Sequence, residues 1–149
     1  MIINAEGQVL GRMCTFVAKQ ALLGREVIVV NAEKAIVTGN KETILNRQLA
    51  KLEIRNKGNY RKGPFHQRRP DRFVRRTIRG MLPFKQERGR QAMKKIQVYM
   101  GIPHEEIKKN HNFEVKEKDI HVLEEMKHHI DQYMTIAEIC NYIGGSGNE

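Results

Sequence analysis

Arginine is concentrated in one part of this sequence, between residues 55 and 90. This stretch holds 10 Arg and 3 Lys against 2 acidic residues, whereas the flanking segments have nearly balanced charges. A guanidinium group binds two phosphate oxygens at once and also stacks on bases. Four of the nine aromatic residues lie in the same stretch, namely Tyr60, Phe65, Phe73 and Phe84. The pattern predicts a surface for irregular or single-stranded RNA, and a merely solvated basic loop is the alternative.

Many of these arginines are predicted to share one face of a helix. Pro70-Asp71 is typical of a helix start, and Pro83 ends the helix. At about 100° per residue, six arginines fall within an arc of roughly 120°. They are Arg68, Arg69, Arg72, Arg75, Arg76 and Arg79. Like charges on one face repel one another, so the lack of acidic neighbours indicates that a polyanion neutralises them.

The same stretch offers further phosphate-binding candidates. The segment from Asn56 to about Arg69 contains several Gly and Asn residues and is predicted to be an extended, basic excursion from the body. In Arg88-Gly89-Arg90, the glycine would allow close backbone approach to a ligand. The candidate RNA-binding residues are Arg12, Lys62, His66, Arg68, Arg69, Arg72, Arg75, Arg76, Arg79, Lys85, Arg88 and Arg90. No residue is assigned a catalytic or metal-binding role, and no cofactor is expected.

The residues before this stretch predict an α/β fold. Met1–Asn4 is apolar, and Val9–Leu23 places apolar residues on one helical face. Glu26–Asn31 contains four consecutive β-branched residues without alternation, which favours a strand buried on both sides in a parallel sheet. Strand, helix and strand over about thirty residues match a right-handed crossover unit.

Three further elements follow from local signals. Ala35–Thr38 is predicted to be a short strand, and Asn40 to cap a helix with apolar residues along one side. These apolar residues are Ile44, Leu45, Leu49 and Leu52. Lys95–Met100 alternates between apolar and polar residues and predicts another strand.

Residues 104–149 are acidic and carry most of the histidines. Ile120–Tyr133 is predicted to be a helix. Thr135 and Glu138 have the spacing of a capping box before a second helix, which Gly144-Gly145 closes. We expect residues 145–149 to be frayed.

Length and composition exclude several classes of protein. A chain of 149 residues with 40% hydrophobic residues suits a single domain with a core. We expect no signal peptide and no membrane span, because no apolar run approaches the ~18 residues needed. Cys14 and Cys140 are isolated in the sequence, which excludes a disulfide framework and indicates small core residues in a reducing compartment.

Several motifs occurring in order resemble a known family. They are Ala5-Glu6-Gly7, Leu10-Gly11-Arg12, Val29 to Lys34 (VVNAEK), Val37 to Asn40 (VTGN), Lys62 to Phe65 (KGPF), Arg68 to Asp71 (RRPD), Arg79 to Pro83 (RGMLP), Arg88-Gly89-Arg90 and Val98 to Gly101 (VYMG). Over about residues 2–103 the chain resembles the large-subunit ribosomal protein thirteen family in its archaeal and eukaryotic form.

The resemblance implies a three-layer α/β/α fold around a small four-stranded parallel sheet. It implies a cytoplasmic, non-enzymatic constituent of the large ribosomal subunit that binds large-subunit ribosomal RNA and supports assembly and translation. Its partners would be that RNA and neighbouring ribosomal proteins, with no membrane and no small-molecule substrate. We expect an RNA-binding domain at residues 1–103, including the basic excursion 56–90, and an acidic helical extension at residues 104–149.

Three other functions are compatible with single motifs of the sequence. Gly7-x-x-x-Gly11 lies between a strand and a helix, as phosphate loops do, but matches no nucleotide-binding motif, so a structural turn is favoured. His121, Glu125 and His128 would share a helical face, yet they lack the paired histidines of a zinc-protease motif. The segment at 133–145 is similar to the first helix of a helix-turn-helix, but no recognition helix follows, which favours a packing helix against the body or a neighbouring protein.

Overall fold

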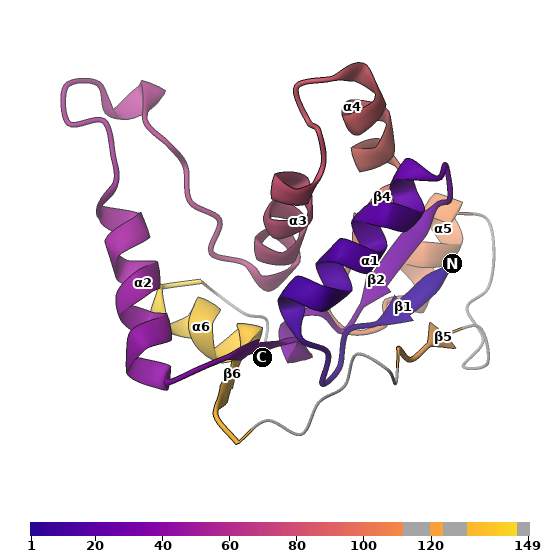
Figure 1. Ribbon diagram of the computed structural model, residues 1–149, viewed down its shortest axis with the longest axis horizontal. Coiled ribbons are helices and arrows are strands. Elements are labelled where there is room, and N and C mark those ends of the chain that lie inside the picture. Colours follow the sequence, from indigo (N-terminus) through magenta and orange to yellow (C-terminus); the bar gives the residue numbers. More distant parts are fainter. Residues whose placement is uncertain (112–119, 124–130, 146–149) are drawn as a thin grey trace.

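The computed structural model describes residues 1–111, 120–123 and 131–145. Its main sheet has four strands, all parallel, in the order β4-β2-β1-β5 (Figure 1). The strands are β1 (Ile2–Asn4), β2 (Val27–Val30), β4 (Ile96–Val98) and β5 (Ile120–His121). The predicted four-stranded parallel sheet is therefore confirmed.

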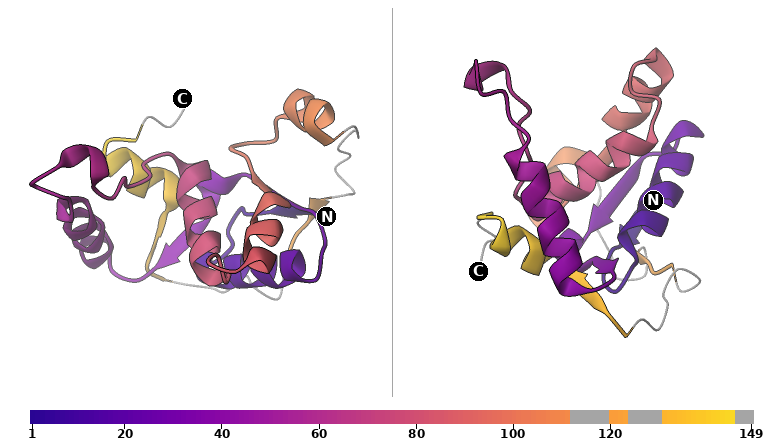
Figure 2. Two further views of the ribbon diagram at one scale, coloured as in Figure 1. Left: turned by 90° about the horizontal axis from the view of Figure 1, so that it is seen from above. Right: turned by 60° about the vertical axis from the view of Figure 1, so that its left-hand side comes forward.

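Helices cover both faces of this sheet. Alternate residues of β1 and β2, including Ile3 and Val29, join the main core with α1 (Leu10–Leu22), α3 (Pro70–Met81) and α4 (Glu87–Lys94). The residues between them, Ile2, Ile28 and Val30, pack against Ile107 of α5 (His104–His111). Figure 2 shows α5 on the opposite side of the sheet from α1. This three-layer α/β/α arrangement explains why β2 is buried at all four positions, as its sequence predicted.

A smaller two-stranded sheet joins distant parts of the chain. The expected strand β3 (Ile36–Thr38) pairs antiparallel with β6 (Tyr133–Thr135). β3 leads into α2 (Lys41–Glu53), where the Asn40 side chain accepts a hydrogen bond from the Glu42 amide at 2.9 Å and confirms the predicted cap.

The strand β6 leads into α6 (Ile136–Tyr142), which begins with the predicted capping box. Ile136, Ile139 and Cys140 are buried in the main core, so α6 packs against the body. Elements from both sides of residue 103 thus share one sheet and one core. That RNA binding is confined to residues 1–103 stays a prediction.

Between α2 and α3 the chain runs outward as an irregular arm, clearly visible in Figures 1 and 2. This basic arm comprises residues 54–69, has six basic residues and no acidic one, and contains only the short 3-10 helix η2 (Tyr60–Lys62). Asn56 accepts hydrogen bonds from the amides of Gly58 and Asn59 and shapes its tip. The predicted excursion between Asn56 and Arg69 is therefore present.

Two expectations for the C-terminal region are wrong. Ile120–Tyr133 is not one helix: Ile120 and His121 form β5 beside β1, and Tyr133 begins β6, while residues 124–130 lie outside the described part. The edge of β1 offers free backbone partners, which favour a strand over an isolated helical turn. Gly145 is buried against Arg68 rather than frayed, and residues 146–149 lie outside the described part.

None of the helices in the described part of the chain combines the length and the apolar character needed to cross a bilayer.

Candidate nucleic-acid interface

Helix α3 separates apolar and cationic side chains onto opposite faces. Val74 and Ile78 are fully buried in the core. Four arginines lie on the outer side and are called the arginine face: Arg72, Arg75, Arg76 and Arg79. The helix begins with Pro70 at its first turn, as predicted, and its apolar face fixes the rotation that keeps the four guanidinium groups outside.

The arginine face has no acidic partner in the part of the chain that the structure describes. Arg72 and Arg76 are exposed, and Arg75 and Arg79 are half-buried. The guanidinium of Arg79 stacks on the ring of Phe84, 3.8 Å from its centroid, which orients this side chain without neutralising it. The charge of the arginine face is therefore available to an external anion.

The same four arginines line an open depression of about 310 Å³, together with Gln67 of the basic arm and Met93 of α4. No acidic residue lines it. A concave surface of one charge concentrates the electrostatic potential and attracts oppositely charged ligands. This arginine depression can hold converging phosphate groups better than a flat array of the same residues could.

The two arginines that precede the helix, Arg68 and Arg69, have different contacts from those of the arginine face. Arg69 forms an ion pair with Asp71, with Nε 3.3 Å from Oδ1, and turns toward another pocket. The expectation that Arg69 shares the arginine face is therefore wrong, because Asp71 at the helix start attracts it. Arg68 is exposed, and its backbone carbonyl packs against Gly145.

The remaining candidates are distributed around this surface. Lys62 is exposed on η2 of the basic arm, and Arg12 is exposed on the first turn of α1. Neither residue lines the arginine depression. The half-buried His66 has its Nε2 3.0 Å from the carbonyl oxygen of Ile54, to which it donates a hydrogen bond that ties the two sides of the arm together.

Lys85, Arg88 and Arg90 are exposed around the start of α4, a helix that the sequence did not predict. Arg90 lies 3.7 Å from Glu87 and donates to the carbonyl of Lys85, so its charge is partly compensated. Gly89 is buried, and a Cβ there would collide with the Pro83 carbonyl. The expectation that Gly89 allows a ligand to approach is wrong, because the space beside this glycine is occupied by the backbone of Pro83.

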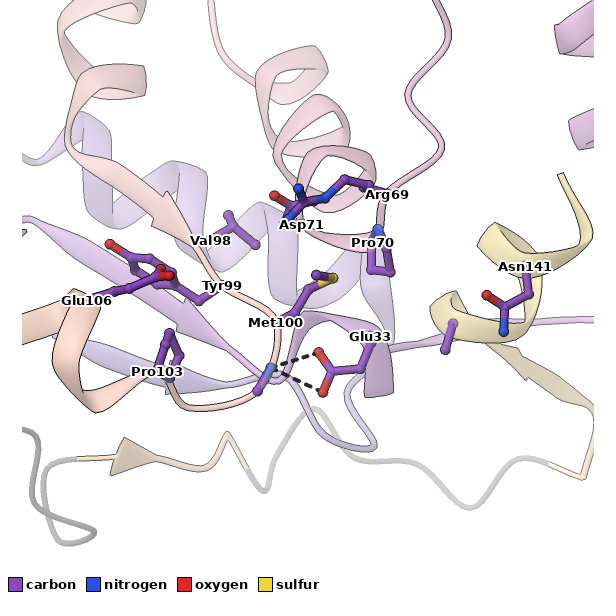
Figure 3. A pocket seen from close by; sticks show the side chains of 12 residues that line it. Glu33, Arg69, Pro70, Asp71, Val98, Tyr99, Met100, Pro103, Glu106 and Asn141 are labelled. Atoms are coloured by element: carbon purple, nitrogen blue, oxygen red, sulfur yellow. Dashed lines mark hydrogen bonds and ion pairs between the residues drawn. The ribbon is translucent and has the colours of Figure 1, made fainter. Parts of the chain in front are cut away.

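A pocket of about 670 Å³ lies near the carboxyl ends of β2 and β4, where α/β proteins often bind small molecules (Figure 3). Glu33, Asp71 and Glu106 line it against the single cation of Arg69. The Glu33 carboxylate accepts a hydrogen bond from the Gly101 amide at 3.1 Å. This carboxylate pocket would repel a nucleotide's phosphates, so it does not favour the alternative of a nucleotide-binding enzyme.

The loop at the first glycine also favours a structural role. Gly7 has φ of 67°, a conformation that L side chains rarely adopt, and makes the turn between β1 and α1. Neither Gly7 nor Gly11 lines the carboxylate pocket. The turn expected between strand and helix is therefore confirmed.

Metal-ligating and thiol side chains do not gather in the described residues. No group of three or more His, Cys, Asp or Glu residues there could hold a metal ion. His121 lies on β5, and Glu125 and His128 lie outside the described part, so the shared helical face is not observed. Burial raises the pKa of Cys14 and of Cys140 to about 12, and for Cys140 the negative charge of Asp71 adds to this effect.

A second depression beside the arginine face was not predicted from the sequence. This arm hollow has a volume of about 330 Å³ and lies between α2, the basic arm, α3 and α6. Gln48, Lys51, Gln67 and Thr77 contribute its polar lining. The polar residues of α2 indicated in the sequence that this side of the helix is exposed. That α2 lies near α3 and α6 depends on long-range contacts, which sequence periodicity does not reveal.

A sequence model of the family described as "Ribosomal protein L13" matches residues 1–105. A protein of Archaeoglobus fulgidus named "Large ribosomal subunit protein uL13" is 40% identical over 146 residues, which are 98% of this chain and 88% of that protein.

Two further relatives carry the same name. The Methanocaldococcus jannaschii protein is 42% identical over 144 residues, 96% of each chain. The Methanococcus maripaludis protein is 51% identical over 104 residues, which are 69% of this chain and 76% of that protein. The motifs noted in the sequence end near residue 103. The two longer alignments extend well beyond residue 105, so the C-terminal segment is also shared with archaeal relatives.

Proposed function

This chain belongs to the ribosomal protein L13 family, and on that premise we propose that it is a structural, non-enzymatic component of the large ribosomal subunit in the cytoplasm. Archaeal relatives that match almost its whole length are named as large-subunit proteins, which supports this role. Its partners are then large-subunit ribosomal RNA and neighbouring ribosomal proteins.

The finer part of the proposal is that the arginine face and the basic arm bind that RNA. The single observation that carries it is the arginine depression, which four arginines line without an acidic partner among the described residues. Binding phosphates there relieves the mutual repulsion of these groups and releases condensed counterions from the RNA. The exposed Lys62, Lys85 and Arg88 extend the positive surface on either side.

The proposed mechanism is an electrostatic clamp on a rigid base. The apolar face of α3 is held in the core, so the helix backbone that carries the four arginines is fixed before RNA arrives, and only their side chains have to become ordered. The basic arm lies outside the body and contains few regular hydrogen bonds. We expect it to become ordered on the RNA at an entropic cost, which the phosphate contacts offset.

The test is the salt dependence of binding between the full chain and a transcript of large-subunit ribosomal RNA. The logarithm of the affinity should fall linearly with the logarithm of the salt concentration, with a slope magnitude of several units. Arg72→Ala, Arg75→Ala, Arg76→Ala and Arg79→Ala should each reduce that slope by about one.

Arg25→Ala is the matched control. Arg25 is exposed after α1, where it donates a hydrogen bond to Gln20, and it does not line the arginine depression. This variant should keep the wild-type slope. A wild-type slope near zero, or equal slopes for all five variants, would refute the arginine face as the contact surface.

A further inference from the structure

The arm hollow has the size and shape of a site for one small unit rather than for a duplex. Its volume of about 330 Å³ lies at the lower end of the roughly 300–1,000 Å³ typical of ligand pockets. Its walls come from four separate parts of the chain, namely α2, the basic arm, α3 and Ile143, which directly follows α6. A hollow enclosed in this way admits a group that projects from a polymer, such as a base turned out of its stack.

The lining of the arm hollow combines apolar and positively charged side chains. Leu52, Phe73 and Ile143 provide apolar surface, and Lys51 and Arg76 provide positive charge. No carboxylate lines the hollow. An unstacked nucleotide has the complementary properties, because its base has two apolar faces and its phosphate is an anion.

Two amide side chains favour a nucleotide over an apolar protein side chain. Gln48 and Gln67 are half-buried in the lining, and neither has a hydrogen-bond partner within the described residues. An apolar occupant would remove water from both amides and leave them unsatisfied, which is unfavourable. The edge of a base carries donors and acceptors that can satisfy them.

The arm hollow also adjoins the arginine depression. Gln67 and Arg76 line both of them. A base seated in the hollow would therefore have its own backbone directed toward the arginine face. The two sites together can hold one strand, with its phosphates on the arginines and one base inserted beside α2.

We propose that the arm hollow binds a single unpaired nucleotide of the RNA, with Gln48 and Gln67 hydrogen-bonding the edge of its base. This rests on the proposed function, and it adds a recognition of base identity to contacts that otherwise read only phosphates. The insertion of the base also fixes the register of the strand on the arginine face.

The experiment is chemical probing of a transcript of large-subunit ribosomal RNA with the full chain bound. Dimethyl sulfate and a carbodiimide report on the edges of unpaired bases, and hydroxyl radicals report on the backbone. The wild-type protein should protect a backbone region and at least one unpaired base within it. Gln48 lines the arm hollow but not the arginine depression, so Gln48→Ala should expose that base again, keep the backbone protection and bind about fivefold more weakly, as expected for one lost hydrogen bond.

The salt slope separates this site from the arginine face. Gln48→Ala removes no charge, so its slope should equal that of the wild-type protein. Gln132→Ala is the control, because Gln132 is an exposed glutamine in a different depression, at the start of β6. Gln48→Glu, which keeps the size of the side chain but replaces its donors, provides a second variant and should also lose the base protection.

Either of two results would overturn the nucleotide site, and a third would refute the RNA binding on which it rests. Backbone protection by the wild-type protein without protection of any unpaired base refutes the nucleotide site alone and leaves the proposed binding by the arginine face intact. Base protection that survives in both Gln48→Ala and Gln48→Glu refutes the proposed hydrogen bonding by the Gln48 amide. Absence of both base and backbone protection refutes the proposed RNA binding itself.

Discussion

The backbone of Gly145 packs directly against the carbonyl group of Arg68. A Cβ at position 145 would collide with the Arg68 carbonyl oxygen and would also come within 2.9 Å of the Cys140 oxygen. This contact joins the end of α6 to the point where the basic arm enters α3. The C-terminal segment therefore helps to fix the base of the surface that we propose binds RNA.

Gly145→Ala should destabilise the fold. We expect the free energy of unfolding to decrease by about 1–3 kcal/mol, because neither backbone segment can move without disturbing the core. Urea unfolding measures the change. Gly11→Ala is the control, since a Cβ on that residue of α1 meets open space and should raise stability by about 0.5–1 kcal/mol. A gain in stability for both variants would contradict the packing contact.

The two faces of α3 should respond differently to truncation. Ile78 is fully buried, so Ile78→Ala should lower the free energy of unfolding by about 2–5 kcal/mol through lost burial and a cavity. Arg72→Ala removes an exposed side chain and should change it by no more than about 0.5 kcal/mol. Thermal or urea unfolding measures both. An equal loss for Arg72→Ala would mean that this guanidinium belongs to an internal network.

The capping box of α6 should contribute to global stability. The Thr135 hydroxyl accepts from the Glu138 amide at 3.2 Å, and the Glu138 carboxylate accepts from the Thr135 amide at 3.0 Å. Thr135→Ala should cost about 1 kcal/mol in urea unfolding, because α6 belongs to the main core. Thr15→Ala removes a hydroxyl whose partners among the described residues are a helix carbonyl and a methionine sulfur, and it should cost less than about 0.5 kcal/mol. Equal losses would argue against the cap.

The buried thiols should be unreactive in the folded protein. At pH 8 neither Cys14 nor Cys140 should react with a thiol reagent, because burial raises each pKa to about 12 and covers the sulfur atoms. Both should react after unfolding in urea. Rapid labelling of either residue without denaturant would show that the core opens locally at that helix.

The same shift predicts how stability changes in alkaline solution. A thiol that ionises near pH 9.0 in the unfolded chain but near 12 in the folded one favours the unfolded state between these values. The contribution of the protonated Cys14 thiol to the free energy of unfolding is therefore intact below pH 9 and is lost as the pH rises toward 12. Cys14→Ala should make the fall in the free energy of unfolding over this range less steep, and an unchanged slope would contradict the shift.

Local signals predicted most of the elements that carry the candidate site. The apolar spacing in α1 and α3, the Asn40 cap of α2 and the β-branched run of β2 each act within a few residues, so each is visible in the sequence. The arginine face followed from the same periodicity. The place of Arg69 did not, because its nearest acid, Asp71, lies two residues away and attracts it out of the arc.

The elements that were missed depend on distant partners. β5 has only two residues, too few to show a period, and exists because β1 has a free edge. The helix α4 contains Gly89, a weak helix former, and the backbone contact with Pro83 that requires this glycine cannot be seen in the sequence. The arm hollow likewise needs α2 and α6 to meet beside α3.

The strand β5 and the helix α6 have a consequence for biosynthesis. Both elements lie far along the chain, yet one completes the edge of the main sheet and the other fills its core. A nascent chain emerging from its N-terminus would expose that edge and part of that apolar surface until residues 120–145 had been translated. The arginine-rich helix α3 is synthesised some forty residues before β5, counted from Met81 to Ile120. Its arginines are therefore exposed to other molecules before the sheet and core that support the helix are complete.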